Sequence, residues 1–141
     1  MLTSLIISPQ QDCWLIKNDK EKFYSQSTNS YELVGFGHIP VDTTRNYEHD
    51  NPFSIENNCL NFKITHIGCD YSFDMFWDGT IKTDKQGQSI VELKFILAYT
   101  DPCKRLNKTN LKYDLTEILK NQAGKKVFIN FVGYDKLIEV K

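Results

Sequence analysis

Apolar and polar residues alternate over three long stretches in the middle of the chain. Leu60, Phe62, Ile64 and His66 are separated by polar residues, and the same period of two recurs over residues 73–77 and 91–99. Side chains of an extended chain point alternately to opposite faces, so this period predicts strands with one buried face. The stretch 91–99 is the longest, and we expect it to be a central strand.

Shorter apolar stretches predict further strands, and polar clusters at residues 18–22 and 25–30 predict turns between them. The one expected helix covers residues 116–122, because Asp114 or Thr116 can cap its start and Gly124 can take a left-handed conformation after its end. The pattern therefore predicts an all-β, antiparallel, two-layer sandwich with one short helix. The additional strands are expected at residues 5–7, 13–16, 31–36, 111–115, 127–131 and 137–140.

The segment 38–54 interrupts this pattern, since it contains two prolines, many polar residues and little alternation. We expect a long irregular loop, and such loops often carry function. Its histidines, His38 and His49, are candidate binding residues. Tyr71 and Phe76 join them, because Phe76 has the opposite parity to its aromatic neighbours and is expected to be exposed beside Tyr71.

Length and charge limit the classes of function. A chain of 141 residues predicts a single domain covering 1–141. Its 17 basic and 18 acidic residues nearly cancel, which gives no reason to expect nucleic acid or an anionic membrane as partner. No apolar run approaches the roughly 20 residues of a membrane span, and the first residues do not resemble a signal peptide. The chain is therefore expected either to be cytoplasmic or to be a mature exported form.

Nothing in the sequence favours catalysis. Glycine-rich phosphate loops, nucleophile elbows and HExxH motifs do not occur in it. His66 is expected to point away from Cys69, which argues against a nucleophile and base pair. Asp74 and Asp78 would lie about 13 Å apart on a strand, too far for paired acid and base work. We expect no enzymatic activity.

Four cysteines leave several chemistries open. They form no CxxC pair, which weakens the case for structural zinc or a thioredoxin-like site. Cys69 and Cys103 each follow a predicted strand, so a bridge between them is a candidate that would contribute about 4 kcal/mol. The alternative is four reduced thiols, as in a cytoplasmic protein.

A metal site is the third interpretation of the cysteines. His66, Cys69 and Cys103, with His38 or His49 in addition, are residue types that bind zinc or copper. The parity of His66 instead places it on the buried face, where a lone histidine is usually a hydrogen-bonded core residue. We therefore expect no cofactor, with zinc or copper as the alternative.

The second half of the chain resembles a family. The stretches GCDYSFDMFWDG, SIVELKFILAYTDPC, LKYDLTEILK and KKVFINFVG, within residues 68–133, are similar to uncharacterised exported or lipoprotein-like β-sandwich proteins of Bacteroidetes. The resemblance implies an immunoglobulin-like sandwich, export and a Cys69–Cys103 bridge. It implies no catalytic residue.

These observations together predict a non-enzymatic binding or interaction module of the bacterial cell envelope, located in the periplasm or on the cell surface after signal removal. Its partner would be an unknown protein or glycan. Two alternatives stay open: a zinc or copper protein with histidine and cysteine ligands, and an intracellular immunity or inhibitor protein with free thiols. The sequence does not predict an oligomeric state.

Overall fold

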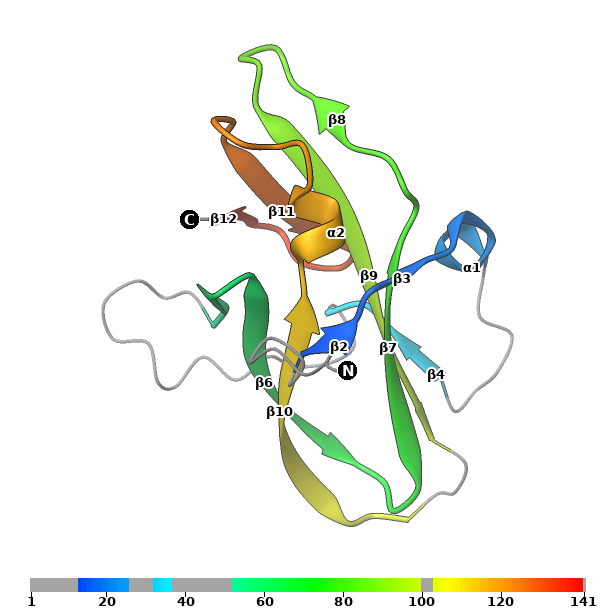
Figure 1. Ribbon diagram of the computed structural model, residues 1–141. Helices are drawn as coiled ribbons and strands as arrows, with labels where there is room; N and C mark the ends of the chain where they lie inside the picture. The colour runs from blue at the N-terminus through cyan, green and yellow to red at the C-terminus, as the bar shows by residue number, and fades with distance from the viewer. Residues whose placement is uncertain (1–12, 26–31, 37–51, 100–102, 141) are drawn as a thin grey trace, which may run out of the picture.

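Two β-sheets face each other and enclose an apolar core (Figure 1). The computed structural model describes residues 13–25, 32–36, 52–99 and 103–140. One sheet has four strands in the order β2-β10-β6-β5, and the other has β12-β11-β9-β7-β3 with β4 and β8 also paired to β9. The predicted all-β, two-layer sandwich is confirmed. The strands are β2 (Trp14–Leu15), β3 (Lys17–Asn18), β4 (Glu32–Val34), β5 (Ser54–Glu56), β6 (Cys59–Ile67), β7 (Tyr71–Trp77), β8 (Lys82–Thr83), β9 (Ser89–Tyr99), β10 (Leu106–Asp114), β11 (Val127–Phe131) and β12 (Leu137–Val140).

The core follows the alternation of the sequence. Leu60 and Ile64 of β6 and Leu93 and Phe95 of β9 are completely buried between the sheets. Aromatic rings fill the centre, where the ring of Phe95 lies edge-on to that of Phe62, with the centroids 5.3 Å apart. Burial of such large apolar side chains is the main favourable contribution to folding.

The predicted central strand is also confirmed. β9 pairs with β7, β4, β8 and β11, and it is the longest strand in the described part of the chain. Not every pair is antiparallel as expected, because β9 with β11, β10 with β2 and β7 with β3 are parallel. The chain leaves β9, returns along β10 in the other sheet and enters β11 from the end at which β9 began, so these two strands run in the same direction.

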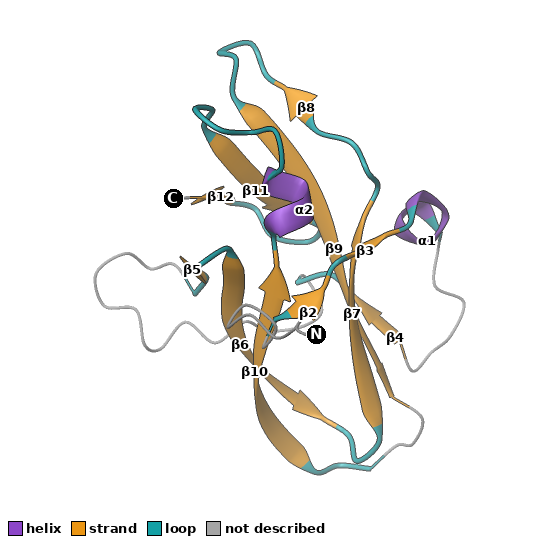
Figure 2. Cartoon of the chain, viewed as in Figure 1, coloured by secondary structure: helices purple, strands orange, loops and turns teal. Residues whose placement is uncertain are grey.

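In the described part of the chain, two short helices lie at different places on the sandwich (Figure 2). α2 (Thr116–Leu119) follows β10, and its Ile118 is buried against the core. It is shorter than the predicted 116–122, because Asn121 already has a positive φ of 69° and ends the helical conformation. α1 (Lys20–Tyr24) replaces one of the predicted turns, and Asp19 caps it by accepting a 2.9 Å hydrogen bond from the Lys22 amide.

Several expectations lie outside the described residues. The strand at 5–7 is among them, as are His38, His49 and most of the irregular segment 38–54. Of that segment, Phe53 is buried in the core and Ser54 begins β5.

Candidate binding site at the disulfide-linked rim

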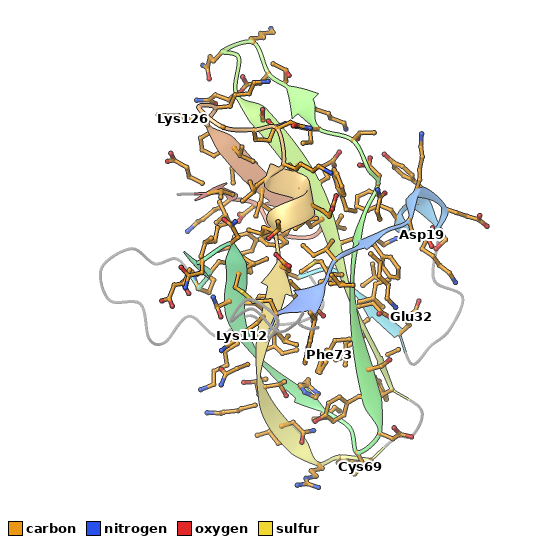
Figure 3. The ribbon with its side chains drawn as sticks, viewed as in Figure 1. Asp19, Glu32, Cys69, Phe73, Lys112 and Lys126 are labelled. Carbon is orange, nitrogen blue, oxygen red and sulfur yellow. A yellow bond between two sulfur atoms is a disulfide. The ribbon has the colours of Figure 1, made fainter. Side chains whose placement is uncertain are left out.

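Two disulfides hold the two ends of β6. Cys13, just before β2, is bonded to Cys59, the first residue of β6, with Cα atoms 6.0 Å apart. Cys69, two residues after the end of β6, is bonded to Cys103 ahead of β10, with Cα atoms 5.6 Å apart. The second bridge lies at the lower end of the molecule in Figure 3, which we call the rim.

The rim is further fixed by hydrogen bonds. The Gly68 amide donates to the carbonyl of Arg105 at 3.0 Å, and the Asn107 side chain donates to the carbonyl of Gly68 at 2.7 Å. Gly68 has a φ of 131°, a backbone conformation that residues other than glycine rarely adopt. The turn between β6 and β7 is thus joined to the start of β10 by backbone, side-chain and covalent bonds.

An apolar pocket of about 220 Å³ opens beside this rim, between the two sheets. Ile67 and Leu106 are directly opposite each other in the β6–β10 ladder, and they are 47% and 65% exposed. Such exposure is unusual for two large aliphatic side chains that lie side by side. The pocket is lined by Leu33, Thr65, His66, Ile67, Leu97, Tyr99 and Leu106.

His66 is the ionisable residue of the pocket lining with a perturbed pKa. It is only 6% exposed, as the alternation of β6 predicts, and its Nε2 is 3.0 Å from the hydroxyl of Thr109. The rings of Tyr71 and Phe73 lie edge-on to the imidazole, with centroids 4.5 and 5.2 Å away. Burial lowers the pKa of His66 below its usual value, so the ring is neutral at pH 7. Its Nδ1 is buried without a hydrogen-bond partner in the described part of the chain.

The predicted pair of exposed rings, Tyr71 and Phe76, is wrong. Tyr71 is partly buried and packs against the core beside His66. Phe76 does lie on the outer face of β7, but it is only 7% exposed. α1 contacts β7 on this side, and the ammonium of Lys17 lies 5.8 Å from the centre of the Phe76 ring. A segment about fifty residues earlier in the chain therefore covers the face that parity alone leaves open.

The candidate metal ligands are not assembled either. Cys69 and Cys103 are bonded to each other, so neither sulfur is a thiolate that could bind zinc or copper. Within the described ranges no cluster of three metal-binding side chains occurs. The set of His66, Cys69 and Cys103 is therefore wrong as a ligand set.

All four cysteines form disulfides, which contradicts the expectation of free thiols in an intracellular protein. Disulfides persist in oxidising compartments, so the two bridges favour an extracellular or periplasmic location. Neither helix in the described residues has the length and apolar character needed to cross a membrane.

The Cys13–Cys59 bridge and most of the pocket were not predicted from the sequence. Cys13 and Cys59 each lie at the start of a strand, a position that could have suggested their pairing. The pocket had no comparable signal, because its lining comes from four strands in both sheets, and Leu33 lies more than sixty residues before Leu97 and Leu106. Each of them taken alone is an ordinary apolar strand residue.

Comparisons with known proteins show little similarity. No protein-family model matches the chain, and no curated protein matches it. A solved structure described as a protein of unknown function DUF1344 from Bacteroides vulgatus is similar with a TM-score of 0.44 and 13% sequence identity. The alignment covers 92% of this chain and 55% of that one, so this chain spans about half the length of the Bacteroides protein.

Proposed function

We propose that this protein is a non-enzymatic binding module of the bacterial cell envelope that recognises a partner protein at the rim. An apolar side chain of the partner enters the rim pocket, and Ile67 and Leu106 pack around it. The observation that carries this proposal is an open apolar pocket flanked by two exposed aliphatic residues and fixed by a disulfide.

The size of the pocket supports a side chain as its occupant. Sites for whole small molecules usually enclose about 300–1,000 Å³, and this pocket is smaller. One large side chain that is buried in a preformed pocket is the typical energetic centre of a protein interface. The bridge between Cys69 and Cys103 reduces the freedom of the rim before binding, which lowers the ordering cost of complex formation.

The chemistry of the pocket supports binding rather than catalysis. Among the residues that line it, His66 has the imidazole that could act as a base, but its Nε2 is engaged with Thr109 and its Nδ1 is buried away from solvent. The sulfur of Cys69 is in a disulfide and is not a free nucleophile. Location in the periplasm or on the cell surface is supported by the two bridges.

Blocked amino acids are suitable probes, because they present single side chains without a partner protein. We expect N-acetyl-leucinamide and N-acetyl-phenylalaninamide to bind with dissociation constants of about a millimolar or weaker. In ¹⁵N-resolved NMR titrations, the amides of His66, Ile67 and Leu97 should shift most. Shifts that spread over the surface, or none at all, would contradict the proposal.

A matched pair of variants tests the location. Ile67→Lys places a charge at the mouth of the pocket and should weaken binding of both probes at least fivefold. Leu137→Lys makes the same kind of change at a residue that is 49% exposed on β12, outside the pocket lining, and should leave binding unchanged. Equal loss in the two variants would mean that the probes do not use the rim pocket.

A further inference from the structure

The outer face of the four-stranded sheet carries a regular set of lysines. Lys63 of β6 and Lys108 and Lys112 of β10 have the parity that points away from the core. Lys108 and Lys112 are exposed and Lys63 is partly so. In the ladder each lysine is opposite a neutral polar residue. The pairs are Lys63 with Asn110, Lys108 with Thr65 and Lys112 with Asn61.

These three lysines have no carboxylate partner in the described part of the chain, unlike lysines of the other sheet. Lys17 is paired with Asp74, and Lys82 is paired with Glu92. The nearest acidic position on the same face of β10 is Asp114, whose Oδ1 already accepts hydrogen bonds from the amide and hydroxyl of Thr116. Glu56 of β5, opposite Cys59, is an exposed carboxylate on the same face, so among the described residues the face carries three lysines and two carboxylates, with the lysines grouped at residues 63, 108 and 112.

The positions of these lysines are consistent with protection of a sheet edge. Lysine on an edge strand hinders pairing with another chain. In the described part of the chain, β2 pairs with β10 only at Tyr113 and Asp114, and β5 pairs with β6 only at residues 59–61, so the three lysine positions pair only across the β6–β10 ladder. Placing like charges along one face also costs some stability through repulsion. Three lysines on one face, with no ion-pair partner in the described part of the chain, also suit an anionic ligand on that face.

The spacing defines the kind of ligand. Positions 108, 110 and 112 are successive outward positions of β10, and Lys63 lies opposite position 110, so the three lysines follow one another at about 7 Å along the strands. We propose that this face binds a linear acidic polysaccharide, with Lys63, Lys108 and Lys112 contacting successive carboxylates along the polymer. Figure 3 shows Lys112 on the outer side of the sheet.

The residues between the lysines favour a sugar polymer over other polyanions. Asn61, Thr65 and Asn110 offer amide and hydroxyl groups that match sugar hydroxyls. The Asn61 side-chain amide donates to the carbonyl of Cys59 at 2.9 Å, which leaves its oxygen to accept a hydrogen bond from a ligand. Single-stranded nucleic acid is usually held by aromatic stacking, and the outward positions of β6 and β10 carry no aromatic residue. Thr65 also lines the rim pocket but the three lysines do not, so the proposal does not rest on that pocket.

Alginate oligomers are the probe, and dextran oligomers of matched length are the neutral control. Binding to the full chain with both disulfides intact is measured by titration calorimetry at low ionic strength. The triple variant Lys63→Gln, Lys108→Gln and Lys112→Gln should bind alginate about tenfold more weakly. Replacing the same residues with arginine keeps the charge and should keep the affinity within about threefold.

A second triple variant controls for net charge. Lys85, Lys125 and Lys126 are exposed in turns elsewhere, with Lys126 near the upper end of Figure 3, and their replacement with glutamine changes the net charge equally, from −1 to −4. This variant should bind alginate like the unmodified protein. Far-ultraviolet circular dichroism and a melting curve verify that every variant is folded.

Several outcomes would overturn the proposal. These are failure of the unmodified protein to bind alginate, equal binding of dextran, and equal losses in the two glutamine variants. Binding of single-stranded DNA or of anionic phospholipid vesicles as tight as that of alginate would also overturn it, since the face would then be a general polyanion surface. Only a loss specific to Lys63, Lys108 and Lys112, with recovery by arginine, supports an acidic polysaccharide.

Discussion

The two sheets of this sandwich are held together by different means. In the four-stranded sheet, β6 is bonded through a disulfide at or near each of its ends, and the edge strands β2 and β5 have only two and three residues. In the seven-stranded sheet, the 11-residue β9 pairs with four other strands, and the strands described there contain no cysteine. The comparison teaches that covalent bonds support the sheet in which the long β6–β10 pair has only short flanking strands.

The outer faces of the two sheets also differ, in the ion pairs that their lysines make. Ion pairs and a buried lysine fix the outer side of the seven-stranded sheet, whereas the outer lysines of the four-stranded sheet have no such partners among the described residues. One face is thus occupied by its own contacts, and the other is the face proposed above to bind an anionic ligand. The predictions below are ordered from the largest expected effect to the smallest.

Removing the disulfides should produce the largest effect. Replacing either bonded pair with alanines, Cys13 with Cys59 or Cys69 with Cys103, should lower the free energy of unfolding by about 4 kcal/mol, because each bridge closes a loop of several tens of residues. Guanidinium denaturation measures the loss.

Hydrogen exchange shows which sheet depends on the bridges. Without the Cys13–Cys59 bridge, amides of β2 and of the first residues of β6 should exchange faster, while amides in the middle of β9 keep their protection. Equal loss of protection in β9 would contradict the idea that the bridges support mainly the four-stranded sheet.

Replacing Lys94 should give the next largest loss of stability. It lies on β9 and is buried, and its ammonium donates hydrogen bonds to the carbonyls of Phe23 and Ser25 at 2.8 and 2.9 Å. Lys94→Met leaves both carbonyls without this donor, so we expect a loss of about 1–3 kcal/mol, measured by chemical denaturation. Lys85→Met, at an exposed turn, is the control and should cost nothing measurable. A small loss for Lys94→Met would mean that α1 is held by its apolar contacts alone.

The sequence predicts those features of the two sheets that depend on neighbouring residues. It does not predict those that depend on contacts between distant segments. The strands β6 and β9 and the burial of His66 follow from alternation, a property of neighbouring residues. The position of α1 over β7 buries Phe76, and that position depends on contacts between segments far apart in the chain.

The parallel pairing of β11 with β9 and the rim pocket likewise depend on how the chain crosses between sheets. The helix α1 was not predicted, and the reason is different. Asp19 followed by Glu21 and Phe23 has the pattern of a helix start, but the charged residues around it are equally typical of a turn.

His66 should make stability depend on pH. Burial lowers the pKa of His66 in the folded protein, so the unfolded chain binds a proton at higher pH than the folded chain does. The contribution of the neutral imidazole is fully present above about pH 6.5, and it is lost as the pH falls from there toward the folded-state pKa. His66→Gln, whose amide can still reach Thr109, removes this titration.

The measurement is the difference in unfolding free energy between the unmodified protein and His66→Gln, followed from pH 7.5 to pH 5. We expect the difference to shrink as the pH falls. Other groups such as Asp78 titrate in both proteins and cancel in the difference. A difference that stays constant over this range would show that the imidazole is not held neutral by burial.

Replacing exposed lysines on the outer faces should change the free energy of unfolding least. The change should have opposite signs in the two sheets. The ammonium of Lys17 is 2.6 Å from a carboxylate oxygen of Asp74, and both side chains are substantially exposed. Lys17→Met should therefore cost about 0.2–1 kcal/mol, and the loss should shrink as salt is added.

Lys112→Met on the four-stranded sheet should cost nothing at low salt, and it should stabilise slightly because it relieves repulsion from Lys63 and Lys108. Denaturation curves at low and high ionic strength measure both changes. If Lys112→Met instead destabilises as much as Lys17→Met, the lysines of the four-stranded sheet contribute to the fold. If it stabilises, their repulsion is a cost that the fold itself does not require, which is the energetic pattern expected of residues whose partner is a ligand.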